Sequence, residues 1–291
     1  MKRAFGWIAV AYAAALAVAV VVGHRVDGDS PLWIAFWADV AATCVVFAFS
    51  VAFRNSSFYD AYWSVAPTAI VFYWLAGAAD GVPALRQVVV SLLVVAWGVR
   101  LTANWARGWT GLDHEDWRYV DLQRKTGRLY WLVSFGGIHM MPTLWVFGGC
   151  LALYPALATG TGDFGALDAI AALVTGAAIA LEFEADQQLR RFRTAPGRSP
   201  EDVLDTGLWA RSRHPNYLGE MGFWWGLWIF ALAADPSWWW TAVGPLAITA
   251  MFRFASLPMI ETRMLERRPE RFAAYQRRTP MVLPWPRPAD S

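Results

Sequence analysis

The sequence has 291 residues, of which 57% are hydrophobic and 16% are charged, and 19 are tryptophan. A soluble domain carries roughly a quarter charged residues, so this composition predicts an integral membrane protein. The formal net charge is +2, and the arginines lie beside apolar runs instead of forming one soluble basic face, which argues against nucleic-acid binding. Cys44 and Cys150 lie in apolar segments and the four histidines show no paired spacing, so neither a disulfide framework nor a metal centre is predicted.

The chain begins with Met1-Lys2-Arg3 and an apolar run to about Gly23. This run is long enough to span a bilayer and no sharp cleavage site follows it, so it predicts a first transmembrane helix rather than a signal peptide. Asp39 lies near the middle of the second predicted span. The remaining spans are predicted at about residues 31–53, 62–80, 84–106, 129–158, 164 into the polar run 181–193, 217–233 and 238–257.

The basic residues show how these spans are oriented. Arginine and lysine are concentrated at the N-terminus, in the loops 107–128 and 190–213, and in the tail from Glu261 onward. With eight spans all four segments fall on one face, so the positive-inside rule places both termini in the cytoplasm; seven spans are the alternative. The tail predicts an amphipathic helix to about Arg278, followed by an extended proline-rich end. No internal repeat is evident, so residues 1–291 are interpreted as a single domain.

The most polar stretch at a predicted membrane boundary is Arg211-Ser212-Arg213-His214-Pro215-Asn216-Tyr217-Leu218-Gly219-Glu220. Pro215 suits the first turn of a helix, so a helix is expected to start there, with Asn216 and Glu220 one turn apart. An interfacial belt of Arg, Tyr and Trp is the alternative, but a belt does not require Asn and Glu to enter the span.

Other polar residues gather at the same predicted ends of the spans, where they could line one pocket. They are Asp60, Arg100, Asn104, Asp186, Arg190, Arg193, Arg213, His214, Asn216, Glu220, Arg253 and Glu261. Guanidinium groups at this density suit a polyanion such as a dinucleotide phosphate; pairing with one another and with lipid headgroups is the alternative. No glycine-rich phosphate loop follows a strand, so the predicted fold class is an all-α polytopic membrane bundle of seven or eight helices without a Rossmann domain.

Several of these motifs resemble one known family. The stretch 212–220 looks like the C-terminal signature of the steroid 5-alpha-reductase family and its bacterial relatives. The run 186–193 is similar to the segment by which that family holds the NADPH phosphates and ribose. Residues 60–67 resemble the stretch where the animal enzymes place a glutamate against the substrate ketone, and residues 115–119 look typical of the bacterial branch. The resemblance covers most of residues 58–285, and it makes 1–30 an extra N-terminal span and 186–291 a cofactor-binding half.

The resemblance implies specific roles. Asn216, Tyr217 and Glu220 would contact the nicotinamide half of NADPH. Asp60 would face the substrate ketone, with Tyr59 or Tyr62 sharing this role, because the tyrosine that assists in the animal enzymes aligns with Trp97. Asp186, Arg193 and Arg100 would hold the ribose and phosphate half. The other predicted cofactor-binding residues are Arg190, Arg213 and His214. The sequence departs from the family at two places. Asp60 is one methylene shorter than the glutamate of the animal enzymes, and residues 261–265 hold no clear equivalent of the family's C-terminal histidine and tyrosine.

The activity implied is NADPH-dependent reduction of the carbon–carbon double bond of a 3-oxo-4-ene steroid or similar enone lipid, by a monomer in the bacterial inner membrane with its cofactor site facing the cytoplasm. An isoprenylcysteine-type methyltransferase using S-adenosylmethionine resembles the chain in its His-Pro-x-Tyr element. A non-enzymatic transporter or scaffold is the third interpretation, although no inverted repeat supports it. NADPH carries phosphates and S-adenosylmethionine does not, so the arginine-rich run favours the reductase.

Overall fold

The computed structural model describes residues 2–26 and 30–284, and every regular element among them is helical. The helices are α1 (Lys2–Arg25), α2 (Pro31–Phe53), α3 (Tyr62–Ala76), α4 (Ala84–Gly108), α5 (Trp117–Thr126), α6 (Tyr130–Ser134), α7 (Met141–Cys150), α8 (Ala166–Thr194), α9 (Pro215–Ala234), α10 (Val243–Met251), α11 (Leu257–Arg267) and α12 (Pro269–Arg278). Short π-helical segments, Phe135–Met140 and Phe252–Ser256, join α6 to α7 and α10 to α11. The predicted all-α bundle without a Rossmann domain is confirmed.

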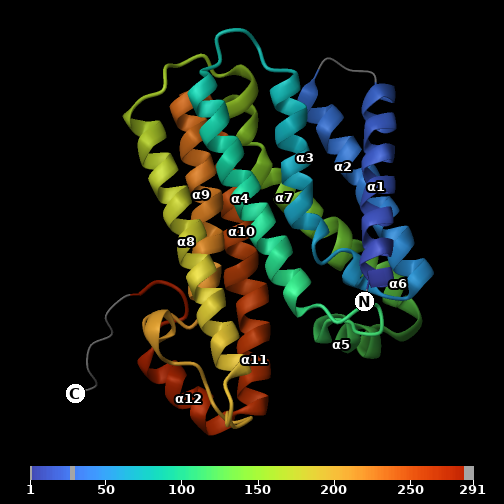
Figure 1. The fold of residues 1–291 in the computed structure, drawn as a ribbon, viewed down its shortest axis with the longest axis vertical. Helices are drawn as coiled ribbons and strands as arrows, with labels where there is room; N and C mark the ends of the chain where they lie inside the picture. Colours follow the sequence, from blue (N-terminus) through green and yellow to red (C-terminus); the bar gives the residue numbers. More distant parts are fainter. Residues whose placement is uncertain (1, 27–29, 285–291) are drawn as a thin grey trace.

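Six helical segments of the described chain are long and apolar enough to cross a membrane: Lys2–Arg25, Pro31–Phe53, Ala84–Gly108, Trp117–Thr159, Ala166–Thr194 and Pro236–Arg267. The two other predicted spans correspond to α3, which has 15 residues, and α9, which has 20 residues and carries Glu220. Both helices run alongside the longer ones in the bundle (Figure 1). The protein is therefore a polytopic helical membrane protein.

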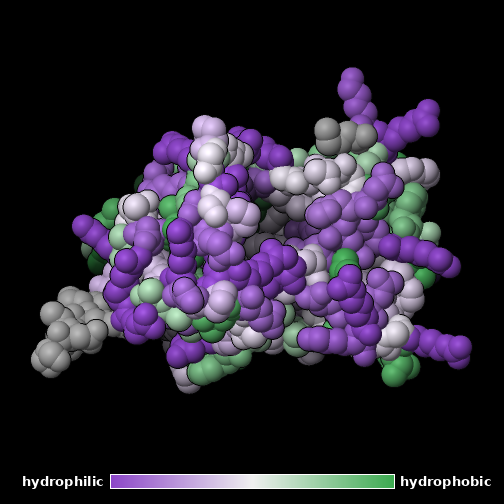
Figure 2. All heavy atoms as spheres, turned by 90° about the horizontal axis from the view of Figure 1, so that it is seen from below, coloured by the Kyte–Doolittle hydropathy of each residue, from purple (hydrophilic) through white to green (hydrophobic). Residues whose placement is uncertain are grey.

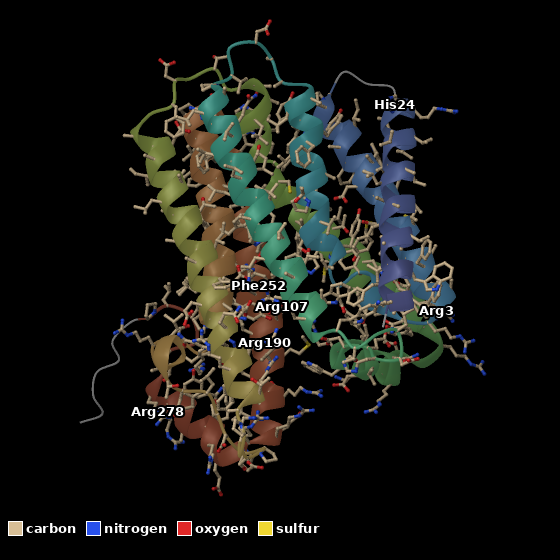
Figure 3. All side chains as sticks on the ribbon, viewed as in Figure 1. Arg3, His24, Arg107, Arg190, Phe252 and Arg278 are labelled. Carbon is tan, nitrogen blue, oxygen red and sulfur yellow. The ribbon has the colours of Figure 1, made fainter. Side chains whose placement is uncertain are left out.

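The basic segments lie toward one end of the bundle. Arg3, Arg107, Arg190 and Arg278 all lie on the side opposite to His24 (Figure 3). Seen from below, this end is covered mainly by hydrophilic side chains (Figure 2). We call it the basic face. The segregation expected from the sequence is thus present, and it is the arrangement that the positive-inside rule associates with a cytoplasmic surface.

The tail differs from the single amphipathic helix predicted between Glu261 and Arg278. The last span continues through α11 to Arg267, and a separate helix, α12, begins at Pro269. Arg268 has φ −143° and ψ 61°, outside the helical region, because the proline ring disfavours a helical conformation in the preceding residue. The prediction of one continuous helix was wrong at this break. The predicted proline-rich end extends into residues 285–291, which lie outside the described part of the chain.

Glycines on α9 allow α8 to pack closely against it, and this contact positions the polar residues of both helices. A Cβ atom at Gly219 would lie 2.7 Å from the Ala178 carbonyl oxygen, and one at Gly226 would lie 2.1 Å from Thr175 Oγ1. Small residues at such positions let helix backbones approach in membranes, where van der Waals packing replaces the hydrophobic driving force. The glycine of the sequence motif therefore has a packing role: it sets the distance between the polar ends of α8 and α9.

Candidate functional site

Five polar side chains meet between α4, α8 and α9, and we call them the inter-helix cluster: Arg100, Asn104, Glu182, Asp186 and Asn216. Arg100 pairs with two carboxylates of α8, at 2.5 Å from Glu182 Oε1 and 2.9 Å from Asp186 Oδ2. Asn104 donates to Asp186 Oδ2 at 3.1 Å, and Asn216 donates to Asp186 Oδ1 at 3.4 Å. Glu182 and Asp186 are one helical turn apart, so both carboxylates face the same side of α8. The structure thus brings together four residues that the sequence had singled out, with Glu182 added.

The inter-helix cluster is incompletely paired. Asn216 Oδ1, Glu182 Oε2 and Arg100 Nε are buried and have no hydrogen-bond partner within the described chain. An unpartnered buried polar atom costs roughly 1–3 kcal/mol, so such atoms call for a ligand or solvent. A groove of about 430 Å³ between α4 and α8 borders the cluster, and Arg100, Asn104 and Asp186 supply part of its lining. A molecule in this groove would therefore meet Arg100, Asn104 and Asp186 directly, whereas Glu182 and Asn216 are not among the residues that line it.

Glu220 is held rigidly beside the inter-helix cluster. Trp97 Nε1 donates to its Oε2 at 2.9 Å, and Trp224 Nε1 donates to its Oε1 at 2.8 Å. The Trp97 ring stacks on Phe223 with ring centroids 4.5 Å apart and an interplanar angle of 6°. Tyr217, one turn before Glu220 on α9, packs edge-on against Phe252. The two motif residues Asn216 and Glu220 thus differ: the carboxylate of Glu220 has a donor at each oxygen, whereas Asn216 keeps a free acceptor.

The arginines at the end of α8 form an exposed basic group. Arg190 and Arg193 are both exposed. Arg193 is close enough to Asp186, Arg198 and Arg268 to interact with them electrostatically. Partial burial, together with Arg198 and Arg267 nearby, lowers the pKa of Arg268. Positive charges gathered in this way suit a multivalent anion. Of these arginines, Arg198 and Arg268 were not predicted as binding residues from the sequence.

Arg213 and His214 occupy a different place from the rest of the motif. The Arg213 guanidinium pairs with both carboxylate oxygens of Glu261, at 2.7 Å and 3.0 Å, and donates to the carbonyl oxygens of Gln276 and Thr279. The His214 imidazole lies 3.0 Å from Glu261 Oε1. These contacts attach α12 and the residues after it to the loop that precedes α9. The structure therefore places both side chains against the tail and outside the inter-helix cluster.

The three predicted catalytic residues point to three different partners. Asp60, in the connection between α2 and α3, accepts a hydrogen bond of 2.6 Å from the Tyr119 hydroxyl. Burial raises the pKa of Asp60 to about 6, against the lowering effect of the Tyr119 hydrogen bond. Tyr59 bonds to Thr143 Oγ1 at 2.6 Å, and Tyr62 donates to Asp39 Oδ1 at 2.9 Å. The structure does not bring Asp60, Tyr59 and Tyr62 together at one point. Asp60 does not cap the helix that follows it, because α3 has Ala61 at its N-cap and no side-chain cap bond.

Helix α5 connects the Asp60 region to the second half of the bundle. Arg118 of α5 interacts electrostatically with Tyr217 of α9. The next residue, Tyr119, donates a hydrogen bond to Asp60. At its start, Trp117 carries the Arg263 guanidinium over its ring at 3.8 Å, and Asp121 pairs with Arg263 at 2.9 Å. Residues 117–126 of the polar loop 107–128 thus form a helix that lies between the α2–α3 connection, which carries Asp60, and α9. It brings Asp60 and the α9 motif into one neighbourhood.

Besides Arg198 and Arg268, two site residues were not among those predicted from the sequence. Glu182 lies in the polar run 181–193, four residues before Asp186, and this one-turn spacing is a signal that could have identified it. Tyr119 belongs to the stretch 115–119 that carries the resemblance, but local spacing could not reveal its bond to Asp60, 59 residues away in the chain.

Fold and site define the class of this protein as a multi-spanning helical membrane protein with a buried polar cluster between its helices. The family described as "Protein of unknown function (DUF1295)" matches residues 46–279, so the chain belongs to this family, which includes steroid 5-alpha-reductase-like membrane proteins. An uncharacterized protein of Schizosaccharomyces pombe is 29% identical over 262 residues, which cover 82% of this chain and 76% of that protein. No solved structure matches the chain.

Proposed function

We propose that the protein is a membrane reductase that uses NADPH to reduce the carbon–carbon double bond of an enone lipid, such as a 3-oxo-4-ene steroid. The observation that carries the proposal is the incomplete pairing of the inter-helix cluster, where Asn216 Oδ1, Glu182 Oε2 and Arg100 Nε are buried without partners. Membership of a family that includes steroid 5-alpha-reductase-like proteins supports it.

The residues present fit the two ends of NADPH. A carboxamide such as that of nicotinamide needs both a donor and an acceptor, which Arg100 Nε and Asn216 Oδ1 provide. The group formed by the exposed Arg193 and the half-buried Arg198 and Arg268 suits the phosphates, because guanidinium binds phosphate oxygens through paired hydrogen bonds. When bound, NADPH would supply the hydride that the enone takes at its beta carbon, leaving as NADP⁺. Arg190, Tyr217 and Glu220 would lie at the borders of this site.

The region around Asp60 would handle the ketone. Negative charge that develops on the ketone oxygen is stabilised by a hydrogen-bond donor aimed at that oxygen. A protonated Asp60 is such a donor, and its raised pKa of about 6 leaves roughly a tenth of the population protonated at pH 7. The Tyr119 hydroxyl, which now bonds to Asp60, is a second donor at the same point. The enolate that results then takes a proton from water at its alpha carbon, which completes the saturated ketone.

Turnover and cofactor binding test the proposal separately. The protein is purified in detergent, and NADPH oxidation is followed with progesterone or testosterone as substrate. Thermal unfolding is compared with NADPH and with S-adenosylmethionine. We expect stabilisation by NADPH alone and oxidation that depends on the enone. Stabilisation by S-adenosylmethionine alone would contradict the proposed reductase function and favour a methyltransferase. Failure of all enone lipids to support NADPH oxidation would also contradict it.

Two variants separate the assigned roles. Asp60→Ala should abolish or strongly reduce turnover while NADPH still binds, because alanine has no donor for the ketone oxygen, whereas Arg193→Ala should weaken NADPH binding. Arg191→Ala is the matched control for the latter, because Arg191 is exposed on the same end of α8 and lies 3.9 Å from Glu184. Equal NADPH affinities of the Arg193→Ala and Arg191→Ala variants would contradict the phosphate assignment. We further propose that the basic face and both termini are cytoplasmic, in a bacterial inner membrane, and that the protein acts as a monomer.

A further inference from the structure

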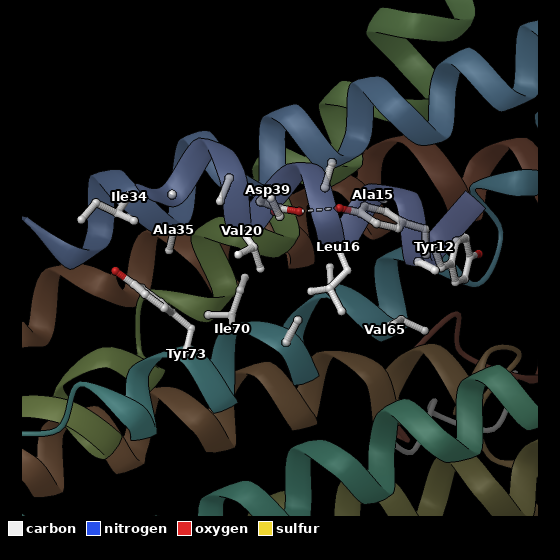
Figure 4. Close-up of a pocket in the computed structure, with 18 of the residues that line it drawn as sticks. Tyr12, Ala15, Leu16, Val20, Ile34, Ala35, Asp39, Val65, Ile70 and Tyr73 are labelled. Carbon is white, nitrogen blue, oxygen red and sulfur yellow. Dashed lines mark hydrogen bonds between the residues drawn. The ribbon is translucent and has the colours of Figure 1, made fainter. Parts of the chain in front are cut away.

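A second, separate cavity lies among the first three helices. It has a volume of about 520 Å³, within the range of small-molecule sites, and is bounded by α1, α2 and α3 (Figure 4). Its walls are built largely from small apolar side chains, including Ala15, Ala35, Ala38 and Ala66. The lining extends on α1 from Tyr12 to His24, which a rise of 1.5 Å per residue converts to about 18 Å. The cavity is therefore elongated and almost entirely apolar, and none of its lining residues belongs to the inter-helix cluster.

One carboxyl group, Asp39, interrupts this largely apolar lining, whose other polar side chains are His24, Tyr12, Tyr62 and Tyr73. Asp39 is 6% exposed, in the middle of a membrane-spanning helix, and lines the cavity. Its Oδ1 accepts the Tyr62 hydroxyl at 2.9 Å, as the dashed line in Figure 4 marks, but its Oδ2 is buried and has no hydrogen-bond partner within the described chain. A carboxyl group inside a membrane is costly and usually marks a functional site with a specific partner. The Oδ2 atom of Asp39 is therefore left for a hydrogen-bond partner that occupies the cavity.

The rim of the cavity faces the surroundings of the bundle at membrane depth. Leu16 and Val20 of α1 and Tyr73 of α3 all line the cavity, and their exposures are 55%, 51% and 40%. The helix that carries Leu16 and Val20 is itself apolar enough to span a membrane, so these side chains meet lipid. A molecule can therefore enter sideways from the bilayer between α1 and α3, which favours a lipid over a water-soluble ligand.

We propose that this cavity binds an apolar lipid that carries a single hydroxyl group, and that the hydroxyl hydrogen bonds to Asp39 Oδ2. A hydroxyl is both a donor and an acceptor, so it satisfies the carboxyl oxygen whether or not that oxygen carries a proton. The rest of such a lipid is matched by the alanine-rich walls and by the elongated shape. The proposal goes beyond the reductase function and does not rest on it. The cavity shares no residue with the proposed cofactor site, and its lining includes Tyr62 but not Asp60, the residue proposed to face the ketone.

Photolabelling with a diazirine analogue of farnesol tests this site. The full-length protein in detergent is labelled, the modified peptides are identified by mass spectrometry, and unlabelled farnesol or farnesene is added as competitor. Farnesene has the same isoprenoid skeleton but lacks the hydroxyl. We expect labelling of peptides from α1, α2 and α3, with farnesol competing about tenfold better than farnesene, as the gain of one buried hydrogen bond predicts. Equal competition by both compounds would show only a non-specific apolar groove and would overturn the proposal.

Two substitutions assign the effect to the cavity. Asp39→Leu should weaken competition by farnesol about tenfold and leave farnesene unchanged, because it removes the carboxyl oxygen to which the hydroxyl bonds. Ala69→Trp should abolish labelling, because Ala69 is an exposed residue of the lining and the indole would fill the cavity from its rim. Ala177→Trp, at an exposed alanine of α8 outside the cavity lining, is the matched control and should label normally. Normal labelling of Ala69→Trp, or an unchanged preference for farnesol in a folded Asp39→Leu variant, would overturn the proposal.

Discussion

Helices α4 and α8 are joined by arginine–carboxylate contacts near both ends, and the two contacts differ in how completely they are paired. At one end Arg86, which is fully buried, bonds to both oxygens of Asp168 at 2.6 Å and 3.0 Å and also donates to the carbonyl oxygens of Gly160 and Asp163. At the other end Arg100 meets Glu182 and Asp186 but leaves its Nε and Glu182 Oε2 without partners within the described chain. The same residue types on the same helices thus form a closed, fully paired contact at one end and an open cluster with unpartnered atoms at the other.

The first way to test this comparison is to break the closed pair. Asp168→Asn removes the charge that compensates Arg86 in a fully buried position, and removing one partner of a buried pair costs about 3–5 kcal/mol. We expect a loss of stability larger than that caused by any substitution in the open cluster, measured by thermal or denaturant unfolding in detergent. Asp163→Asn is the control, since Asp163 contributes only its carbonyl oxygen to Arg86 and its side chain is exposed. Similar stabilities of the two variants would contradict a structural role for the Arg86 pair.

The second test changes the spacing of the helices that carry the open cluster. Gly219→Ala adds a methyl group 2.7 Å from the Ala178 carbonyl oxygen, a backbone atom that cannot rotate away. Overpacking of this kind costs about 1–3 kcal/mol and should push α9 from α8, which would separate Asn216 from Asp186. We expect lower stability together with weaker NADPH binding, measured by thermal unfolding with and without NADPH. Gly222→Ala is the milder control, because its nearest neighbour would be the Ala178 Cβ at 3.1 Å. Equal effects of the two variants would show that the close approach at Gly219 does not set the geometry of the cluster.

These elements also show what the sequence could and could not reveal. The start of α9 at Pro215, the continuation of α8 through the polar run, and the shared face of Arg100 and Asn104 follow from local rules of helix geometry, and the structure agrees with them. The motif 211–220 was interpreted as one unit, yet its first half bonds to Glu261, 47 and 48 residues further along the chain. Local spacing carries no information about such long-range partners.

The region of Asp60 shows the same limit more sharply. Tyr59, Asp60 and Tyr62 are almost adjacent in sequence, and their side chains contact α7, α5 and α2, respectively. Their directions are set by a turn between a short 3₁₀ helix and α3, followed by three tertiary contacts that no periodicity encodes. Proximity in the sequence therefore suggested one catalytic group where the structure has three separate contacts.

The third test removes the free acceptor of the open cluster. Asn216→Ala loses the unpartnered Oδ1 and one long hydrogen bond of 3.4 Å to Asp186, so little stability depends on it. We expect NADPH affinity to fall about tenfold, which corresponds to about 1.4 kcal/mol, with a change in unfolding free energy below about 1 kcal/mol. Binding is measured by the quenching of tryptophan fluorescence or by thermal shift. Gln123→Ala, on the exposed side of α5, should change neither quantity. A large loss of stability with unchanged NADPH affinity would show that Asn216 has a structural role like that of the Arg86–Asp168 pair.

The smallest expected effect concerns the Asp60 carboxyl as a function of pH. Burial raises its pKa to about 6 in the folded protein, from 3.8 as the ordinary value, so the folded state holds this proton more tightly than the unfolded state. The proton bound to Asp60 therefore stabilises the folded state fully below about pH 4, and this stabilisation is lost as the pH rises through about 6. The asparagine side chain of Asp60→Asn cannot ionise, so the variant should be as stable as the wild type at about pH 4. At about pH 8 it should be more stable by about 1 kcal/mol, a figure that allows for solvent screening at this partly exposed site. Thermal unfolding across this pH range, with the exposed Asp113→Asn as control, measures the difference. If Asp60→Asn is less stable than the wild type at the alkaline end, Asp60 belongs with Asp168 as a structural acceptor, and the Tyr119 hydroxyl then becomes the better candidate for the group that faces the ketone.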